Sequence, residues 1–177
     1  MRTVAMVLAG GRGSRVATEV NKVFLSVHDR VMLDYPLETF HLAEQVDEIV
    51  VVSRREDDER LRQLLGSRSG KPVRVVTGGA SRHESEIAGI ESLAGPIEAG
   101  EIELVAIHDG ARPFMTLDLL EACINTARRL GGAIPGLPPE SPLYRLTGNG
   151  ALPLDESALI RAQTPQVFEA KALLGAY

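Results

Sequence analysis

Short apolar runs alternate with amphipathic segments along most of the chain. The runs are rich in valine, isoleucine and leucine, which is typical of strands buried on both faces of a sheet, and the segments between them carry apolar residues at helical spacing. The pattern predicts strands at 3–8, 47–53, 73–76 and 103–107 and helices at 32–43, 55–65, 84–93 and 117–130. Strands that alternate with helices indicate an α/β fold, a three-layer, doubly wound domain around a mostly parallel sheet.

The pattern changes beyond Gly131. Prolines and glycines gather between residues 135 and 153, and neither a central strand nor a regular helix tolerates them well. We therefore expect a protruding arm or long loop at about residues 136–160. Because no other composition shift and no internal repeat occurs, residues 1–177 are expected to form a single domain.

Composition and charge restrict the class of protein. A hydrophobic content of 44% in 177 residues allows one sizeable core, and a net charge of -5 argues against an extended nucleic-acid surface. No apolar run reaches the roughly 18 residues of a membrane span, and the N-terminus lacks a signal-peptide pattern. The single cysteine, Cys123, cannot form an internal disulfide, which suits a reducing compartment. We expect a soluble, cytoplasmic protein without a membrane or nucleic-acid partner.

Glycines follow the first predicted strand, in the run Ala9-Gly10-Gly11-Arg12-Gly13-Ser14-Arg15. A backbone with few side chains lets a polyphosphate approach its N–H groups, and the cations Arg15 and Lys22 can neutralise phosphate charge. A P-loop needs its lysine directly after the last glycine, and a dinucleotide fingerprint needs a small residue where Val16 stands. A tight turn between strand and helix explains one or two glycines but not the two cations.

A second glycine pair follows the third predicted strand, within residues 77–85. Gly78 and Gly79 would let a planar base or a ribose lie against the backbone, while Ser81 or Ser85 could cap the next helix. Ordinary turn and capping chemistry accounts for the same residues. Both interpretations stay open on this stretch alone.

The fourth predicted strand ends in His108-Asp109. A carboxylate at the C-terminal end of a parallel strand lies on the edge where open α/β sheets bind ligands. Asp109 is the best candidate to hold Mg²⁺, which prefers few carboxylates together with phosphate oxygens and water. A histidine at a strand end is more often a structural group than a ligand, so His108 is given no catalytic role.

The glycine run with Lys22 seven residues beyond Arg15 resembles the signature loop of sugar-nucleotide and polyol-phosphate nucleotidyltransferases. Three later stretches, 79–85, 108–114 and 162–168, narrow the resemblance to the family of 2-C-methyl-D-erythritol 4-phosphate and ribitol 5-phosphate cytidylyltransferases. The four motifs occur in the family's order and cover nearly the whole chain.

The resemblance implies a reaction and a set of roles. The acceptor's phosphate would attack the α-phosphorus of CTP, with Mg²⁺ as cofactor, pyrophosphate as leaving group and a homodimer formed through the arm. The implied catalytic residues are Arg15 and Lys22. The implied nucleotide-binding residues are Ala9, Gly10, Gly11, Gly13, Gly79, Arg82 and Ser85. Arg112 and Thr164 would bind the polyol-phosphate acceptor, and Asp109 the metal.

Several residues depart from the family pattern. Ser141-Pro142 stands where the family usually has Asp-Thr, and Glu156 stands where it has an arginine that helps to bind the acceptor's phosphate. A carboxylate cannot replace a guanidinium in that role. Lys22 follows Asn21 in place of the usual proline. Family members also continue for a few dozen residues, so the C-terminal end of the family domain is expected to be missing here.

Three alternatives to the leading interpretation, a methylerythritol-phosphate enzyme of isoprenoid biosynthesis, follow from these residues. The first is a ribitol-phosphate enzyme or a paralogue with another acceptor. The second is a regulatory protein that binds the nucleotide without turnover, which Glu156 and Pro142 favour. The third, an oxidoreductase, is disfavoured because no third glycine follows Gly13.

Overall fold

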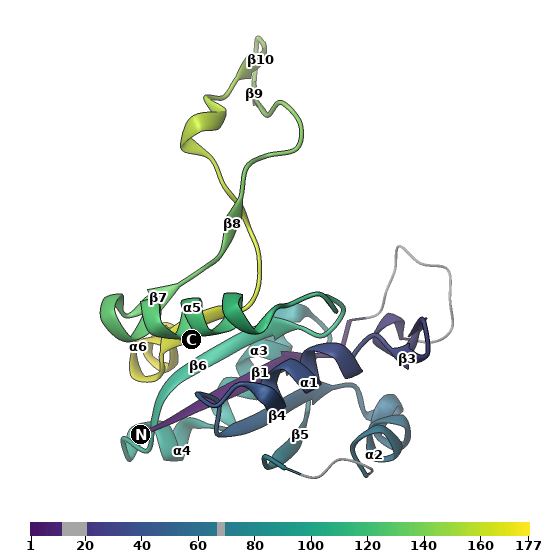
Figure 1. Ribbon diagram of the computed structural model, residues 1–177. Helices are drawn as coiled ribbons and strands as arrows, with labels where there is room; N and C mark the ends of the chain where they lie inside the picture. Colours follow the sequence, from purple (N-terminus) through teal and green to yellow (C-terminus); the bar gives the residue numbers. More distant parts are fainter. Residues whose placement is uncertain (12–20, 67–69) are drawn as a thin grey trace.

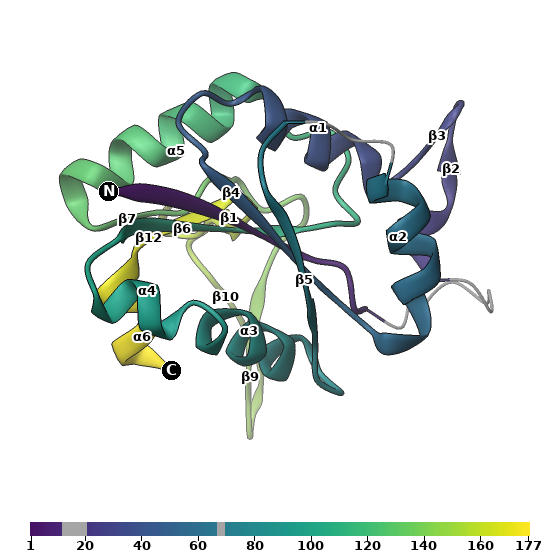
Figure 2. The ribbon, with the colours of Figure 1, turned by 90° about the horizontal axis from the view of Figure 1, so that it is seen from below.

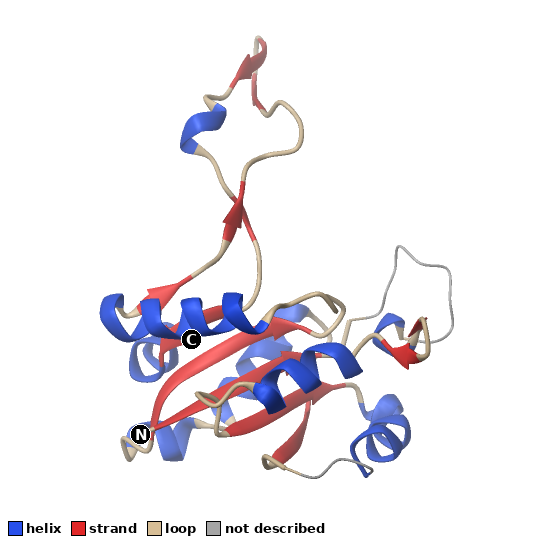
Figure 3. Cartoon of the chain, viewed as in Figure 1, coloured by secondary structure: helices blue, strands red, loops and turns tan. Residues whose placement is uncertain are grey.

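The computed structural model describes residues 1–11, 21–66 and 70–177. Six strands of the described chain form one sheet in the order β5-β4-β1-β6-β12-β7. Figure 3 shows the strands in red and the helices in blue. Four of these sheet strands are mutually parallel: β1 (Arg2–Leu8), β4 (Glu48–Ser53), β5 (Val73–Thr77) and β6 (Ile102–Asp109). β12 (Gln166–Glu169) runs antiparallel to both of its neighbours, β6 and β7 (Gly132–Ala133). The predicted mostly parallel sheet is confirmed.

β1 lies at the centre of the sheet, hydrogen-bonded to β4 on one side and to β6 on the other. Its alternate side chains enter two separate cores: Val4, Met6 and Leu8 pack on one face, and Ala5 and Val7 on the other. All five are buried. A strand buried on both faces carries apolar residues at successive positions, which is why its sequence reads as a continuous hydrophobic run.

Helices cover both faces of the sheet, so the predicted three layers are present (Figure 2). One face carries α1 (Asp34–Leu42), α2 (Asp58–Gly66) and α5 (Leu117–Leu130). The other carries α3 (Arg82–Glu91), α4 (Ala94–Glu98) and α6 (Ala170–Ala176). The shorter elements of the body are η1 (Lys22–Phe24), β2 (Ser26–Val27), β3 (Arg30–Val31) and η2 (Arg55–Asp57).

Side chains cap the starts of two helices, and one of these caps places a residue of the later site. Ser81 and Glu84 form a capping box at the N-terminus of α3, so that the helix begins at Arg82. Thr116 caps α5 by accepting a hydrogen bond from the backbone of Leu119. The fold thus holds Arg82 at the first turn of a helix that starts just beyond β5.

Residues between β7 and β12 leave the body of the protein as an extension (Figure 1). Its base is a short ladder of β8 (Gly136–Leu137) with β11 (Arg161–Ala162), and beyond it lie the hairpin of β9 (Tyr144–Thr147) and β10 (Gly150–Pro153) and the single turn η3 (Glu156–Ala158). All residues of β9 and β10 are exposed.

None of the helices in the described residues has both the length and the apolar character that a bilayer crossing needs.

Candidate active site

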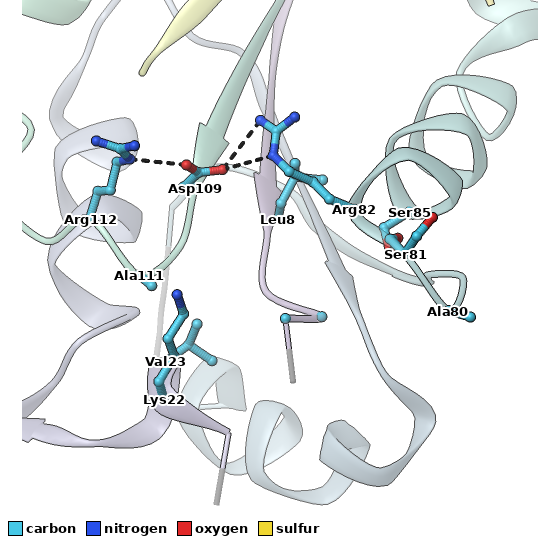
Figure 4. Close-up of a pocket in the computed structure, with 12 residues that line it drawn as sticks. Leu8, Lys22, Val23, Ala80, Ser81, Arg82, Ser85, Asp109, Ala111 and Arg112 are labelled. Atoms are coloured by element: carbon cyan, nitrogen blue, oxygen red, sulfur yellow. Dashed lines mark hydrogen bonds and ion pairs between the residues drawn. The ribbon is translucent and has the colours of Figure 1, made fainter. Parts of the chain in front are cut away.

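A cleft of about 660 Å³ opens where β1 and β6 end and α3 begins. Its walls contain many of the residues that the sequence singles out: Gly10, Gly11, Lys22, Arg82, Ser85, Asp109 and Arg112 (Figure 4). They meet because parallel strands deliver the residues at their carboxyl ends to one edge of the sheet. Three of the four motifs, far apart in the sequence, therefore line one cleft, and the fourth, at residues 162–168, contacts it from behind through Gln163, which accepts from Arg112.

Other predicted site residues lie elsewhere. Ala9 is fully buried behind the cleft, where its backbone N–H donates to Val52 of β4. Thr164 lies beneath the wall at 7% exposure, and Gly79 is not part of the cleft lining. The predictions for Gly13 and Arg15 fall outside the described residues.

Asp109 is the charged centre of the cleft wall, between two arginines (Figure 4). Its Oδ1 accepts from Arg82 Nη2 at 3.3 Å, and its Oδ2 from Arg112 Nε at 3.0 Å. A second acceptor fixes each guanidinium: Glu86 pairs with Arg82 at 2.5 Å, and Gln163 Oε1 accepts from Arg112 Nη1 at 2.6 Å. Both guanidiniums keep further N–H groups and are about half exposed, so they are oriented and still able to bind an anion.

Gln163 and Glu86 are the site residues that the sequence does not reveal. Glu86 stands four residues after Arg82, a helical spacing at which opposite charges meet, and this is the one signal that could have identified it. Gln163 lies within a recognised motif, but its partner Arg112 is 51 residues away in the chain.

Lys22 points into the cleft from the wall opposite Asp109 (Figure 4). It is the first residue of η1, a turn that Asn21 caps. Across the described part of the chain, its ammonium group has neither a hydrogen-bond nor an ion-pair partner. None of the described residues therefore neutralises its charge.

His108 is completely buried beside Asp109. Its Nε2 lies 3.0 Å from the carbonyl oxygen of Arg112, and its Nδ1 lies 2.9 Å from Thr164 Oγ1. A carbonyl can only accept, so Nε2 carries the proton, and the Thr164 hydroxyl donates to Nδ1. Burial lowers the pKa of His108 to about 4, so the ring is neutral at pH 7. These contacts agree with a structural role for His108.

The same contacts occupy the hydroxyl group of Thr164. Its hydroxyl proton is donated to His108, and Oγ1 lies 3.4 Å from the backbone nitrogen of Asp109, within reach of that N–H.

A second cavity, of about 440 Å³, is lined by Thr164 together with Arg112, Phe114 and Gln163. Arg112 lines both cavities and so connects the cleft to the base of the extension.

The glycine pair before α3 has a local explanation. A Cβ on Gly79 would stand 2.2 Å from Glu84 Cβ, and one on Gly78 would stand 2.6 Å from Ser85 Oγ. Both glycines are required by the close packing of the chain against the capped helix start. Gly11, by contrast, is exposed, and a Cβ there would meet no atom of the described residues within 4 Å, as expected of a backbone that receives a ligand.

Asp109 fits one kind of metal site. No group of three or more histidine, cysteine, aspartate or glutamate side chains able to hold a metal occurs in residues 1–11, 21–66 and 70–177. Mg²⁺ does not need such a cage, because it commonly takes one or two carboxylates and completes its shell with substrate phosphates and water. A single carboxylate beside a glycine loop and a lysine suits that arrangement.

Comparison with known proteins identifies the family. The model of the family described as IspD, 2-C-methyl-D-erythritol 4-phosphate cytidylyltransferase, matches residues 3–177. The chain belongs to this family. The predicted family and enzyme class are confirmed, and the predicted reaction is the one that the family name describes.

Individual relatives agree with the family match. The chain is 37% identical to the 2-C-methyl-D-erythritol 4-phosphate cytidylyltransferase of Cereibacter sphaeroides, over all of this chain and 77% of that protein. It is 31% identical to the Clostridium tetani enzyme of the same name, over 97% of this chain and 69% of that protein. The solved 4-diphosphocytidyl-2C-methyl-D-erythritol synthase from Anaerococcus prevotii superposes with a TM-score of 0.84 at 25% identity, covering 98% of this chain and 74% of that one.

Proposed function

We propose that this cleft transfers CMP from CTP to the phosphate of 2-C-methyl-D-erythritol 4-phosphate. The observation that carries the proposal is the convergence of Lys22, Arg82 and Arg112 on a cleft that Gly10 and Gly11 also line. Three cations around an open backbone match a triphosphate and a phosphorylated acceptor that must approach each other.

The reaction needs no covalent bond between the protein and the substrates. An acceptor phosphate oxygen forms a bond to the α-phosphorus of CTP while the bond to pyrophosphate breaks, and no protein nucleophile takes part. Lys22, together with Arg15, stabilises the negative charge that grows on the α-phosphate, and the cleft holds the two reactants in line. Gly10, Gly11 and Gly13 receive the triphosphate, while Arg82 and Ser85 lie at the nucleoside end.

The acceptor is assigned to the Arg112 side. Gln163 and Asp109 orient the Arg112 guanidinium, and Arg112 is the residue that both cavities share. The acceptor's phosphate would pair with this guanidinium, next to the α-phosphate that it attacks. Thr164 supports the same wall through its contacts with His108 and Asp109.

Asp109 would hold Mg²⁺ at this edge. The metal, when bound, reduces the charge of the phosphates and polarises the bond to the leaving group. In the structure both carboxylate oxygens of Asp109 contact guanidiniums, so the residue also orients Arg82 and Arg112.

The extension is assigned to a second subunit. It exposes large apolar side chains on a segment that packs on no core of its own: Leu137, Leu143, Tyr144, Leu146, Leu152 and Ile160. Exposed apolar side chains gathered in this way mark interaction surfaces. A homodimer in which each extension reaches the other subunit accounts for them. The unpaired Cys123 suits the cytoplasm as the compartment.

Release of pyrophosphate tests the function. Purified protein is incubated with Mg²⁺, with CTP, ATP, GTP or UTP, and with methylerythritol phosphate or ribitol phosphate, and Lys22→Ala serves as the matched inactive variant. We expect turnover with CTP and methylerythritol phosphate only. Equal rates with all four nucleotides would refute the cytidine assignment, and CTP binding without turnover on either acceptor would indicate a regulatory protein.

A second candidate, an enzyme with a different acceptor, is favoured by Glu156. This exposed carboxylate lies on η3, where the family pattern has an arginine that binds the acceptor's phosphate. In the same assay, turnover with ribitol phosphate or an unphosphorylated polyol in place of methylerythritol phosphate would support this candidate.

A further inference from the structure

Asn21 is almost completely buried, at 2% exposure, directly before Lys22. Its amide nitrogen donates to the carbonyl oxygen of Ala9 at 2.6 Å and to Asp57 Oδ2 at 2.8 Å. Its amide oxygen accepts from the backbone N–H of Val23 at 3.4 Å, which caps η1. The carbonyl oxygen of Ala9 and the carboxylate oxygen of Asp57 can only accept hydrogen bonds. The amide nitrogen of Asn21 must therefore face them, which determines the orientation of the amide.

Asp57 is the buried counterpart of Asn21, also at 2% exposure. A buried carboxylate is costly unless it is paired and hydrogen-bonded. Arg54 meets both requirements, because its Nε and Nη2 donate to Oδ2 and Oδ1 at 3.0 and 3.3 Å. The carboxylate is therefore held from two sides, by the guanidinium and by the Asn21 amide.

Three separate parts of the chain meet at this pair. Ala9 is the first residue of the glycine run and still hydrogen-bonds to β4 through Val52. Asp57 lies in η2, just beyond the end of β4, and Asn21 leads into η1. The pair thus links the start of the glycine run, whose Gly10 and Gly11 line the cleft, to the turn from which Lys22 enters it.

We propose that Asn21 and Asp57 are positioning residues that set the place of Lys22 relative to the glycine loop. The inference rests on the proposed function, in which the Lys22 ammonium stabilises charge on the α-phosphate. Lys22 is the first residue of η1, so the Asn21 cap determines where its side chain starts. A displacement of about 1 Å at such a position can cost on the order of a hundredfold in rate.

Double-mutant cycles with Lys22 test the proposal. Asn21→Ala is expected to lower kcat by about 10- to 100-fold while KM for CTP changes by less than about threefold, because the ammonium is misplaced and the rest of the cleft persists. In a Lys22→Ala background the same substitution should change kcat by less than about threefold. Equal losses in both backgrounds would overturn the proposal, since Asn21 would then not act through Lys22.

Graded variants separate positioning from folding. Asp57→Asn keeps an acceptor for the Asn21 amide and should cost less in kcat than Asp57→Ala, whereas Asn21→Asp brings two carboxylates together and should cost most. Thr3→Val, which changes a buried hydroxyl at the other end of β1, is the control for a loss of stability alone. A loss of kcat in Thr3→Val as large as in Asn21→Ala at matched stability would overturn the proposal.

The outcomes also separate this inference from the proposed function. A normal kcat in Lys22→Ala would contradict the catalytic role of the lysine itself, and with it the positioning role of Asn21. If Lys22→Ala lowered kcat strongly and the losses from the two substitutions were additive, only the positioning role of Asn21 would be contradicted. Where Asn21→Ala fails to fold, Asp57→Asn supplies the cycle, with calorimetric titration of CTP to show that the nucleotide site is intact.

Discussion

At the scale of single residues, the site depends on where protons are held. His108 donates from Nε2–H to a carbonyl, and in the neutral form its Nδ1 accepts from the Thr164 hydroxyl. A protonated ring could still donate from Nδ1 to the Thr164 oxygen, so it is the burial of the ring, which lowers the pKa of His108, that disfavours the charged form. The wall that carries Asp109 and Arg112 therefore holds an uncharged histidine at neutral pH.

Stability should fall in mild acid because of this histidine. Burial lowers the pKa of His108 from 6.5 to about 4, so between these values the unfolded chain binds a proton that the folded chain does not. The free energy of unfolding should decrease by up to roughly 3 kcal/mol as pH falls through this interval. Urea unfolding from about pH 7 to about pH 4.5, in EDTA, measures it.

The matched variant is His108→Gln, which can still donate to Arg112 and cannot titrate. The difference in unfolding free energy between wild type and variant should shrink as pH falls. Parallel pH profiles of the two proteins would contradict the assignment, because carboxylates elsewhere titrate equally in both.

Lys22→Ala and Arg15→Ala should lower turnover far more than CTP affinity. The charge of each side chain matters most when the α-phosphate is most negative, so each loss should raise the barrier by about 2 to 4 kcal/mol, roughly 30- to 1000-fold in rate. Steady-state pyrophosphate release and calorimetric CTP titration give the two quantities. Arg62→Ala, on the exposed surface of α2, is the control cation. Near-normal rates in both variants would show that the loop serves binding only.

The sequence indicates which residues reach the site but not how they are held. Asp109, Arg112, Arg82 and Lys22 could be predicted because strand ends and glycine runs put them at one edge of a parallel sheet. Gln163, Glu86 and the Asn21–Asp57 pair could not be assigned their roles. Their contacts join segments that only the folded chain brings together, as for Asn21 and Asp57, which are 36 positions apart in the sequence.

At the scale of elements, the start of α3 joins stability to ligand binding. The capping box of Ser81 and Glu84 determines where the helix begins, and Arg82 is its first residue. Gly79 leaves no room for a side chain beside Glu84. The same glycine that permits the cap therefore sets the position of a guanidinium in the cleft.

Gly79→Ala should weaken both the fold and the nucleotide site. Its Cβ would displace Glu84 and break the capping box, at a cost of about 1 to 3 kcal/mol in unfolding free energy. CTP affinity should fall as well, because Arg82 moves with the helix start. Thermal denaturation and calorimetry measure the two effects. Gly95→Ala in α4, where a Cβ meets no atom within 4 Å among the described residues, is the control. If Gly79→Ala were less stable than wild type but bound CTP equally tightly, the capping box would not set the position of Arg82 for CTP binding.

Elements with strong local signals are predicted closely. The helix at 117–130 is found with those bounds, because Thr116 caps its start and Gly131, with φ of 84°, ends it. α4 contains Gly95 and Pro96, which disguise a helix in the sequence. β12 is not predicted either, because its insertion between β6 and β7 is decided by the tertiary fold.

At the scale of the whole molecule, the extension carries the residue least compatible with the family's acceptor site. Glu156 lies on η3, beyond the β8–β11 ladder and away from the body of its own subunit (Figure 1). It can take part in an acceptor site only if the extension reaches a cleft in a second copy. The proposed dimer and the proposed effect of Glu156 thus both require that the extension reaches the cleft of a second copy.

Glu156→Arg is expected to raise kcat/KM for methylerythritol phosphate by about tenfold or more, because a carboxylate that faces the acceptor's phosphate repels it and a guanidinium attracts it. Pyrophosphate release from CTP, with methylerythritol phosphate, ribitol phosphate and an unphosphorylated polyol as acceptors, measures the change. Glu98→Arg on the exposed surface of α4 makes the same change in net charge away from the extension. A wild type as efficient as an ordinary family member, with no gain from the arginine, would show that Glu156 does not face the acceptor.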